Sequence, residues 1–215
     1  MSSAGEWVRQ GAASLGISLT PRALEQLSAY VALLSKWNRV YNLTAIRDER
    51  RIVSHHILDS LAVLAHLPQG DLLDVGSGAG LPGIPIAIAQ PARKVTLLDS
   101  NQKKGAFLRQ AVAELGLANA QVATGRVEDF HPPRPYAVVI ARAFSDLPDF
   151  LGLAGRLCAP GGAMTAMKGL YPAAEIAQLP AGWKIESAPA LEIPEVGASR
   201  HLVVLRAAEP VGFPT

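Results

Sequence analysis

The sequence has a single cysteine and lacks any long hydrophobic run. On its own, Cys158 cannot form an intramolecular disulfide or a cysteine-based metal cluster. No apolar run approaches the ~18 residues that a membrane-spanning helix needs. The opening residues, "MSSAGEWVRQ", also lack the apolar stretch of a signal peptide. We therefore expect a cytoplasmic protein that does not cross a membrane.

Charge is also scarce, and neither sign dominates. Charged residues make up 18% of the chain and hydrophobic residues 49%, which excludes global disorder and allows a substantial core. A net charge of +2 is too small for a protein that coats nucleic acid in general, but it permits a local basic patch. The 215 residues suffice for one domain with a modest extension.

The first third of the chain has the pattern of helices. Thr20 can cap a helix and Pro21 suits its first position. Apolar residues then recur at steps of three and four, at Leu24, Leu27, Val31, Leu34, Trp37 and Tyr41. This spacing predicts one amphipathic helix. The apolar residues over 47–67 predict a second helix. The turn signal "PQG" follows, so we expect residues 1–68 to form a helical extension packed on the main domain.

From residue 69 onward, short β-branched or leucine-rich runs alternate with helical patterns. The runs are "DLLDVG", "KVTLLDS", "AQVATG", "YAVVIARAF" and "GAMTAMKG". This alternation predicts a mainly parallel sheet with helices on both faces. Two last runs, "WKIESAPALEI" and "RHLVVLRA", have no helix between them and predict a hairpin with an antiparallel final strand. We therefore expect a Rossmann-like α/β domain over 69–215.

The segment "DVGSGAGLPG" (74–83) lies between the first strand and the first helix of this domain. Ligands of such sheets bind beyond the carboxyl ends of the strands, and glycines let them approach the backbone. The letters "GAGLPG" match a dinucleotide fingerprint. The longer pattern, Asp74 followed by Gly76, Gly78 and Gly80, resembles instead the first motif of methyltransferases that use S-adenosylmethionine. That resemblance places Asp74 near the cationic methionine end of the cofactor. A tight turn without a ligand is the remaining alternative.

Asp99 ends the second strand about 20 residues beyond the glycine loop, the spacing of a ribose-binding carboxylate. Such a carboxylate accepts hydrogen bonds from both ribose hydroxyls. The alternative is a cap for the helix that starts near Asn101. With the glycine loop upstream, we favour ribose binding, and we place the adjacent Ser100 in the same site.

The third and fourth strands bring further candidates to the same edge. Val127 and Glu128 fall where a doubly wound sheet meets adenine, although Glu128 also suits a solvated surface position. Arg142 and Phe144 end the fourth strand. An arginine there can bind the methionine carboxylate or an RNA phosphate, or form an ordinary salt bridge. Lys168 occupies the next position along this rim.

With these motifs in register, the chain resembles the ribosomal RNA small subunit methyltransferase G family, also called the glucose-inhibited division protein B family. The resemblance covers nearly the whole chain. It rests on "KWNRVYNLTAI" (36–46), "HHILDSL" (55–61), "DVGSGAGLPGIPIAI" (74–88), "LLDSNQKKGAFL" (97–108), "GRVEDF" (125–130), "ARAF" (141–144), "MKG" (167–169) and "RHLVVL" (200–205). Ala141 and Ser199 depart from the serine and glutamate that the family often has there.

The resemblance implies methyl transfer from S-adenosyl-L-methionine to N7 of a guanine in 16S ribosomal RNA, leaving S-adenosyl-L-homocysteine. The guanine is nucleotide 527, in the 530 loop. The implied partner is 16S rRNA or the small ribosomal subunit, and we expect a monomer. By position, the expected cofactor site comprises Gly76, Gly78, Gly80, Leu81, Asp99, Ser100, Val127, Glu128 and Arg142.

Arg142 is the candidate catalytic residue, as a positioner rather than a proton donor. Guanine N7 has a free lone pair and no proton, so the transfer needs alignment and no general base. No metal is expected, because His55 and His56 would point about 100° apart on a helix. RNA contacts are expected among Lys36, Arg39, Lys103, Lys104, Arg126, Arg142, Lys168 and Arg200.

Three other functions stay open at this point. "GAGLPG" and Asp99 would also suit an NAD-dependent oxidoreductase. A non-catalytic RNA-binding assembly factor could keep the same fold. A methyltransferase of small molecules would share the glycine motif, although the full-length resemblance disfavours it.

Overall fold

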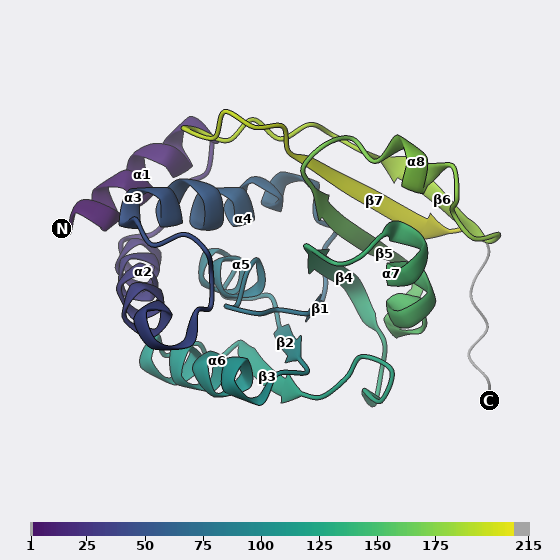
Figure 1. Cartoon of the computed structure of the whole chain (residues 1–215), viewed down its shortest axis with the longest axis horizontal. Helices are drawn as coiled ribbons and strands as arrows, with labels where there is room; N and C mark the ends of the chain where they lie inside the picture. Colours follow the sequence, from purple (N-terminus) through teal and green to yellow (C-terminus); the bar gives the residue numbers. More distant parts are fainter. Residues whose placement is uncertain (1, 209–215) are drawn as a thin grey trace.

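The computed structural model describes residues 2–208 and centres on a seven-stranded sheet (Figure 1). Its strand order is β3-β2-β1-β4-β5-β7-β6. The strands are β1 (Leu72–Val75), β2 (Val95–Asp99), β3 (Ala120–Thr124), β4 (Tyr136–Arg142), β5 (Cys158–Lys168), β6 (Trp183–Ser187) and β7 (His201–Ala207). Met1 and residues 209–215, the end of the predicted main domain, lie outside the described residues.

Strand directions match the prediction. β1 to β5 run parallel to one another, and β7 pairs antiparallel with both β5 and β6. The Rossmann-like sheet with an antiparallel last strand is therefore confirmed. The predicted strand over 183–193 is shorter, because β6 ends at Ser187 and only Ala190 forms an isolated bridge, to His201.

Helices cover both faces of the sheet, which explains why all residues of β1 and β2 are buried. One apolar core lies under α5 (Gly83–Ala89), α6 (Gln102–Glu114) and the N-terminal helices. The other lies under α7 (Leu147–Ala154), the turn η3 (Gly155–Leu157) and α8 (Ala173–Ile176). Leu72 faces the first core and Leu73 the second, as alternation along a strand requires.

The N-terminal helices belong to the first of these cores. They begin with α1 (Ser3–Ser14) and α2 (Pro21–Tyr41), and Thr20 caps α2 as predicted, its side chain accepting from the Ala23 N–H. Leu27 and Leu34 of α2 are fully buried in one cluster with Phe107 of α6. The division at residue 68 stays a prediction, and it marks a change in element type within one continuous core.

The predicted helix over 47–67 is interrupted. It consists of α3 (Glu49–Ile52), a π-helical turn η1 (Val53–Leu58), α4 (Asp59–Ala62) and a 3₁₀ turn η2 (Leu64–His66). A π turn inserts a residue and rotates the side chains that follow, often at functional sites. His56 lies in this turn and Asp59 follows it, and both are buried. Within residues 2–208, no helix is long and apolar enough to span a bilayer.

Candidate active site

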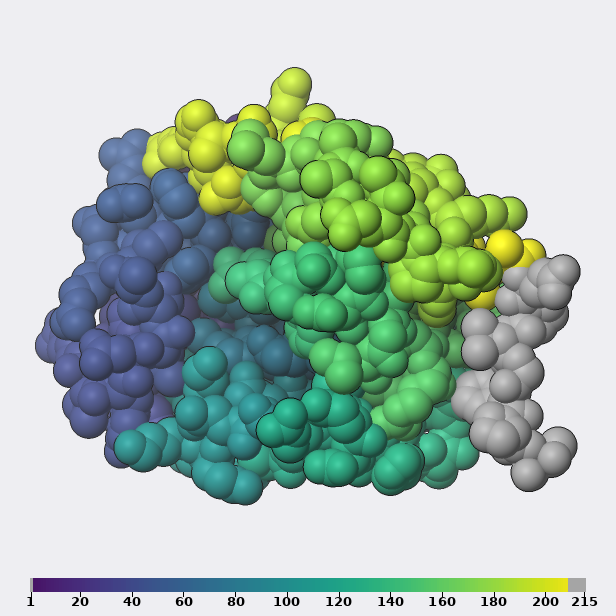
Figure 2. All heavy atoms as spheres, turned by 45° about the vertical axis from the view of Figure 1, so that its right-hand side comes forward, coloured from purple at the N-terminus to yellow at the C-terminus, as the bar shows by residue number. Residues whose placement is uncertain are grey.

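The carboxyl ends of β1, β2 and β4 carry the expected site residues into one region of the molecule. Figure 2 shows the surface hollowed between the blue N-terminal third and the green segments that follow β4 and β5. The glycine loop follows β1, the Asp99 turn follows β2, and Arg142 ends β4. The N-terminal segment and the sheet edge therefore form the two sides of one cleft.

The glycine loop adopts a backbone that other residues would strain. Gly76, Gly78 and Gly80 have φ values of 69°, 61° and 87°. A side chain on Gly80 would also collide with Ile84, 2.4 Å from the added Cβ, so packing alone explains that glycine. A Cβ added at Gly76 would have no such neighbouring atom within 4 Å, and one added at Gly78 would have its nearest neighbour at 3.7 Å. These two glycines therefore leave open space that a ligand can enter, whereas Leu81 is buried.

Asp74 holds this loop with one carboxylate oxygen. Its Oδ2 accepts from the Ser77 hydroxyl at 2.6 Å and from the Gly83 N–H at 2.9 Å. Within residues 2–208, its fully buried Oδ1 has no hydrogen-bond partner. Burial raises the pKa of Asp74 to about 6, although both hydrogen bonds oppose the rise. A buried acceptor left unpaired is costly, so Oδ1 fits a ligand that brings a cationic donor.

Asp99 joins the glycine loop to the start of α6. Its Oδ2 accepts from the Gly78 N–H and its Oδ1 from the Asn101 N–H, both at 2.8 Å. Asn101 is the residue that caps α6, by accepting from the N–H groups of Lys103 and Lys104. Each oxygen of Asp99 keeps a second lone pair, so the carboxylate can still accept from ribose hydroxyls. The predicted Ser100 is exposed between them.

The loop after β3 is shaped by an arginine that the sequence patterns did not reveal. Arg156 donates to the carbonyls of Val127, Glu128 and Phe130 at 2.7, 2.9 and 3.0 Å. The exposed Glu128 carboxylate pairs with Arg126 at 2.9 Å, and this hydrogen bond lowers its pKa. Because two carbonyls of the predicted adenine site bind Arg156, the half-buried Val127 side chain is the better surface for a flat ring.

Arg142 reaches from β4 to the N-terminal segment. Its Nη1 lies 3.5 Å from Asp59 Oδ2 and 3.2 Å from His56 Nδ1. The other oxygen of Asp59 accepts from Arg200 Nε at 3.2 Å. His56 Nε2 lies 2.6 Å from the Thr44 hydroxyl. The resulting polar cluster, buried at His56 and Asp59, contains two residues from "HHILDSL" and one each from "KWNRVYNLTAI", "ARAF" and "RHLVVL".

The charge of Arg142 affects pKa values both within this cluster and at the glycine loop. Burial, and then Arg142, lower the pKa of His56 to about 4, so the imidazole is neutral at pH 7. Burial raises the pKa of Asp59, while Arg142 and Arg200 oppose the rise. The charge of Arg142 also lowers the pKa of Asp74. Arg142 thus acts on the Asp74 carboxylate on one side and on Asp59 on the other.

Two buried side chains of α2 also shape the site, although their patterns indicated only a helix face. The Tyr30 hydroxyl donates to the Ala79 carbonyl in the glycine loop, at 2.5 Å. Asn38 donates to the Ile46 carbonyl and accepts from the Thr44 N–H. Asn38 therefore fixes the segment around Thr44, whose hydroxyl contacts His56. Asn38 lies in "KWNRVYNLTAI", so the family resemblance is the one signal that marked it.

The expected RNA-facing cations separate into two groups. Lys168 pairs with Glu175 at 2.8 Å, Arg126 pairs with Glu128, and Arg142 and Arg200 share Asp59. In the described part of the chain, no ion pair involves the other four, Lys36, Arg39, Lys103 and Lys104. Phe144 packs on Phe150 with ring centroids 5.3 Å apart. Over residues 2–208, no group of three or more histidine, cysteine or acidic side chains is arranged to hold a metal.

Comparisons with known proteins identify the family of the chain. The family model for rRNA small subunit methyltransferase G matches residues 23–203. Two proteins named ribosomal RNA small subunit methyltransferase G, from Aromatoleum aromaticum and Ralstonia nicotianae, are 52% and 53% identical to this chain. The alignments cover 92% and 91% of this chain and 96% and 92% of those proteins.

Solved structures share the fold at low identity. A SAM-dependent methyltransferase from Aquifex aeolicus aligns with a TM-score of 0.58 and 17% identity, over 81% of this chain and 97% of that one. TrmN from Thermus thermophilus aligns with a TM-score of 0.54 and 22% identity, over 72% and 53%. At such identities, these similarities establish the fold alone.

Proposed function

The chain belongs to the rRNA small subunit methyltransferase G family, and from this membership we propose that it methylates N7 of guanine nucleotide 527, in the 530 loop of 16S rRNA. As a member of this family it is a methyltransferase, and its cofactor is S-adenosyl-L-methionine. The match to this family over residues 23–203 carries the proposed RNA target. The unpaired Asp74 Oδ1 and the open space at Gly76 and Gly78 support the cofactor site.

The residues at the cleft fit this cofactor in charge and shape. Asp74 would accept from its ammonium group, and Arg142 would bind its carboxylate. Asp99 would accept from the ribose hydroxyls, and the Val127 side chain would cover the adenine ring. Bound there, S-adenosylmethionine supplies a methyl group activated by its sulfonium. A pyrophosphate would place negative charge beside Asp74, and this disfavours the oxidoreductase alternative.

The proposed reaction requires the protein to position the cofactor and the guanine. Guanine N7 attacks through its own lone pair, so no side chain has to remove a proton. This agrees with the state of His56, which is neutral and surrounded by Thr44 and Arg142. We therefore assign Arg142 to cofactor orientation. The proposed substrate is 16S rRNA, free or in the small subunit, and the proposed enzyme is a monomer.

Mass spectrometry of 16S rRNA tests the proposal. Cells with the gene should carry a methylated guanine at nucleotide 527, and cells without it should not. An unchanged 530 loop would overturn the assignment of the target. Calorimetry with S-adenosylhomocysteine and NADH tests the cofactor separately, because an oxidoreductase would bind only the second.

A further inference from the structure

His56 lies between Arg142 and Thr44, and these neighbours determine which of its ring nitrogens carries the proton. Arg142 Nη1 lies 3.2 Å from Nδ1, and the Thr44 hydroxyl lies 2.6 Å from Nε2. A guanidinium can only donate, so Nδ1 must present its lone pair to Arg142. The His55 carbonyl is also 2.9 Å from Nδ1, but after burial the charge of Arg142 affects the pKa of His56 more than that carbonyl does. We therefore assign the proton of the neutral imidazole to Nε2, which donates to Thr44.

Both acceptor positions of the half-buried Thr44 hydroxyl are then occupied. Its oxygen accepts from His56 Nε2–H and from the Ile46 N–H, the latter at 3.1 Å. A hydroxyl has two lone pairs and one hydrogen, so only the hydrogen remains. With this assignment, no hydrogen bond among residues 2–208 uses that hydrogen. Thr44 therefore presents a hydroxyl that can donate to a ligand and cannot accept from one.

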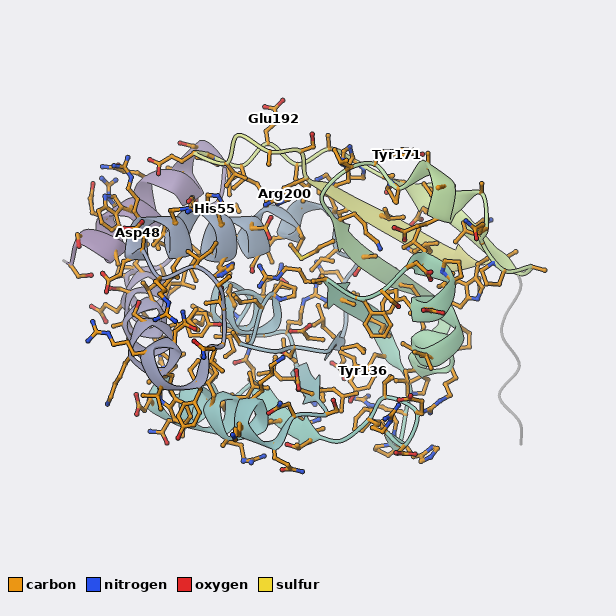
Figure 3. All side chains as sticks on the ribbon, in the orientation of Figure 1. Asp48, His55, Tyr136, Tyr171, Glu192 and Arg200 are labelled. Atoms are coloured by element: carbon orange, nitrogen blue, oxygen red, sulfur yellow. The ribbon has the colours of Figure 1, made fainter. Side chains whose placement is uncertain are left out.

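Thr44 lies close to the methionine end of the proposed cofactor site. One imidazole ring separates its hydroxyl from the Arg142 guanidinium, and the N-terminal segment that carries it forms one side of the hollow in Figure 2. Arg142 is itself held by Asp59, which also accepts from Arg200, labelled beside α4 in Figure 3. In the proposed function Arg142 binds the methionine carboxylate, and the methyl-bearing sulfur belongs to that same end of the cofactor. A guanine that receives the methyl group therefore enters beside Thr44.

We propose that Thr44 donates a hydrogen bond to O6 of the target guanine, and that His56 is the positioning residue that keeps Thr44 a donor. On the edge that is methylated, guanine presents the acceptors N7 and O6, whereas adenine presents N7 and a 6-amino donor. Both purines have the nucleophile, so N7 alone does not distinguish them. A hydroxyl that can only donate pairs with O6 and opposes the adenine amino group. This inference rests on the proposed function and explains how that site selects guanine.

The test uses 16S rRNA, free and in reconstituted small subunits, with guanine, 2-aminopurine or 2,6-diaminopurine at nucleotide 527. Both analogues keep N7, but 2-aminopurine lacks O6 and 2,6-diaminopurine has an amino group in its place. Single-turnover methylation at saturating S-adenosylmethionine should be faster on guanine than on either analogue. Thr44→Val should lower the advantage of guanine over 2-aminopurine about tenfold, because the variant cannot donate to O6. A general loss of activity, which a merely structural role would cause, cancels in this ratio.

His56→Ala should change a different ratio. Without the Nε2–H donor, Thr44 has a lone pair that can accept from the 6-amino group. The advantage of guanine over 2,6-diaminopurine should therefore fall about tenfold, while its advantage over 2-aminopurine is kept. Thr44→Ser retains the hydroxyl and should match the wild type in both ratios.

Thr165→Val is the matched control, because it removes a hydroxyl from a buried threonine of β5, which donates to the Val139 carbonyl at 3.3 Å. Both of its ratios should equal those of the wild type. Equal guanine-to-2-aminopurine ratios in the wild type and Thr44→Val would overturn the proposal, and so would the same drop in Thr165→Val. A wild-type protein that leaves guanine 527 unmethylated would overturn the proposed function instead.

Discussion

The Tyr30 hydroxyl donates a hydrogen bond to the Ala79 carbonyl at 2.5 Å, and it thereby ties α2 to the glycine loop. Tyr30 is fully buried, and burial raises the pKa of its hydroxyl, so the group stays a donor. A buried carbonyl needs a donor. The glycine loop takes this one from a helix about fifty residues earlier. The N-terminal segment therefore helps to build the cofactor site.

Tyr30→Phe should weaken both the fold and cofactor binding. The change keeps the ring in its cavity and leaves the Ala79 carbonyl without its donor, which costs about 1–3 kcal/mol of unfolding free energy. The loop then loses its anchor, so affinity for S-adenosylhomocysteine should fall as well. Urea denaturation and calorimetry measure the two effects.

Tyr136→Phe is the matched control for this prediction. The Tyr136 hydroxyl is buried and donates to the Thr96 hydroxyl at 3.0 Å, away from the glycine loop. Its removal should lower stability and leave affinity for S-adenosylhomocysteine unchanged. Equal affinity losses in the two variants would show that the effect of Tyr30 is general destabilisation.

Cofactor affinity should depend on the protonation of Asp74. Burial raises the pKa of Asp74 to about 6 in the protein without ligand, and a bound ammonium group at Oδ1 would lower that pKa. Affinity for S-adenosylhomocysteine should therefore rise about tenfold between pH 5 and pH 7. Asp74→Asn should bind weakly with a flat profile over this range. A wild-type profile that is already flat would contradict an ionised Asp74 in the complex.

Asp74 and His56 should have opposite effects on the pH dependence of stability. The raised pKa of Asp74 gives stability that is present below pH 4 and lost as pH rises through 6. The pKa of His56, lowered to about 4, gives stability that is present above pH 6.5 and lost as pH falls through 4. Each contribution is about 3 kcal/mol, so the two largely cancel in the wild type.

Single substitutions should separate the two contributions. Relative to the wild type, Asp74→Asn should gain unfolding free energy as pH rises from 4 to 6. His56→Gln should gain it as pH falls from 6.5 to 4. Urea denaturation at half-unit steps of pH measures both slopes. Equal slopes in the two variants would mean that these groups do not titrate as described.

Most of the fold could be predicted because it depends on local patterns. The alternation of short apolar runs and helices from residue 69 predicts the parallel sheet, and Thr20 with Pro21 predicts the start of α2. The π turn could not be predicted, because its buried His56 and the neighbouring Asp59 contact Arg142, which lies far away in sequence. Periodicity describes one helix and carries no information about such a partner.

The same limit applies to the site. The glycine loop and Asp99 are marked by short-range spacing, and both lie where the sequence placed them. Arg156, Tyr30 and Ser77 act through hydrogen bonds that depend on tertiary geometry, so no spacing marks them. Ala143, beside Arg142, has a φ of 56°, a strained value that an alanine in the sequence does not predict.

Cofactor and RNA binding should separate at the junction of β2 and α6. Asp99→Ala removes the acceptor of the Gly78 and Asn101 N–H groups, so it should weaken binding of S-adenosylhomocysteine by about tenfold or more. Lys103→Ala and Lys104→Ala leave the Asn101 cap intact, because only their backbone N–H groups take part in it. Each should mainly weaken binding of 16S rRNA and lower its salt slope. Equal losses of cofactor affinity in all three variants would contradict this division, because the lysines would then act through the loop rather than on RNA.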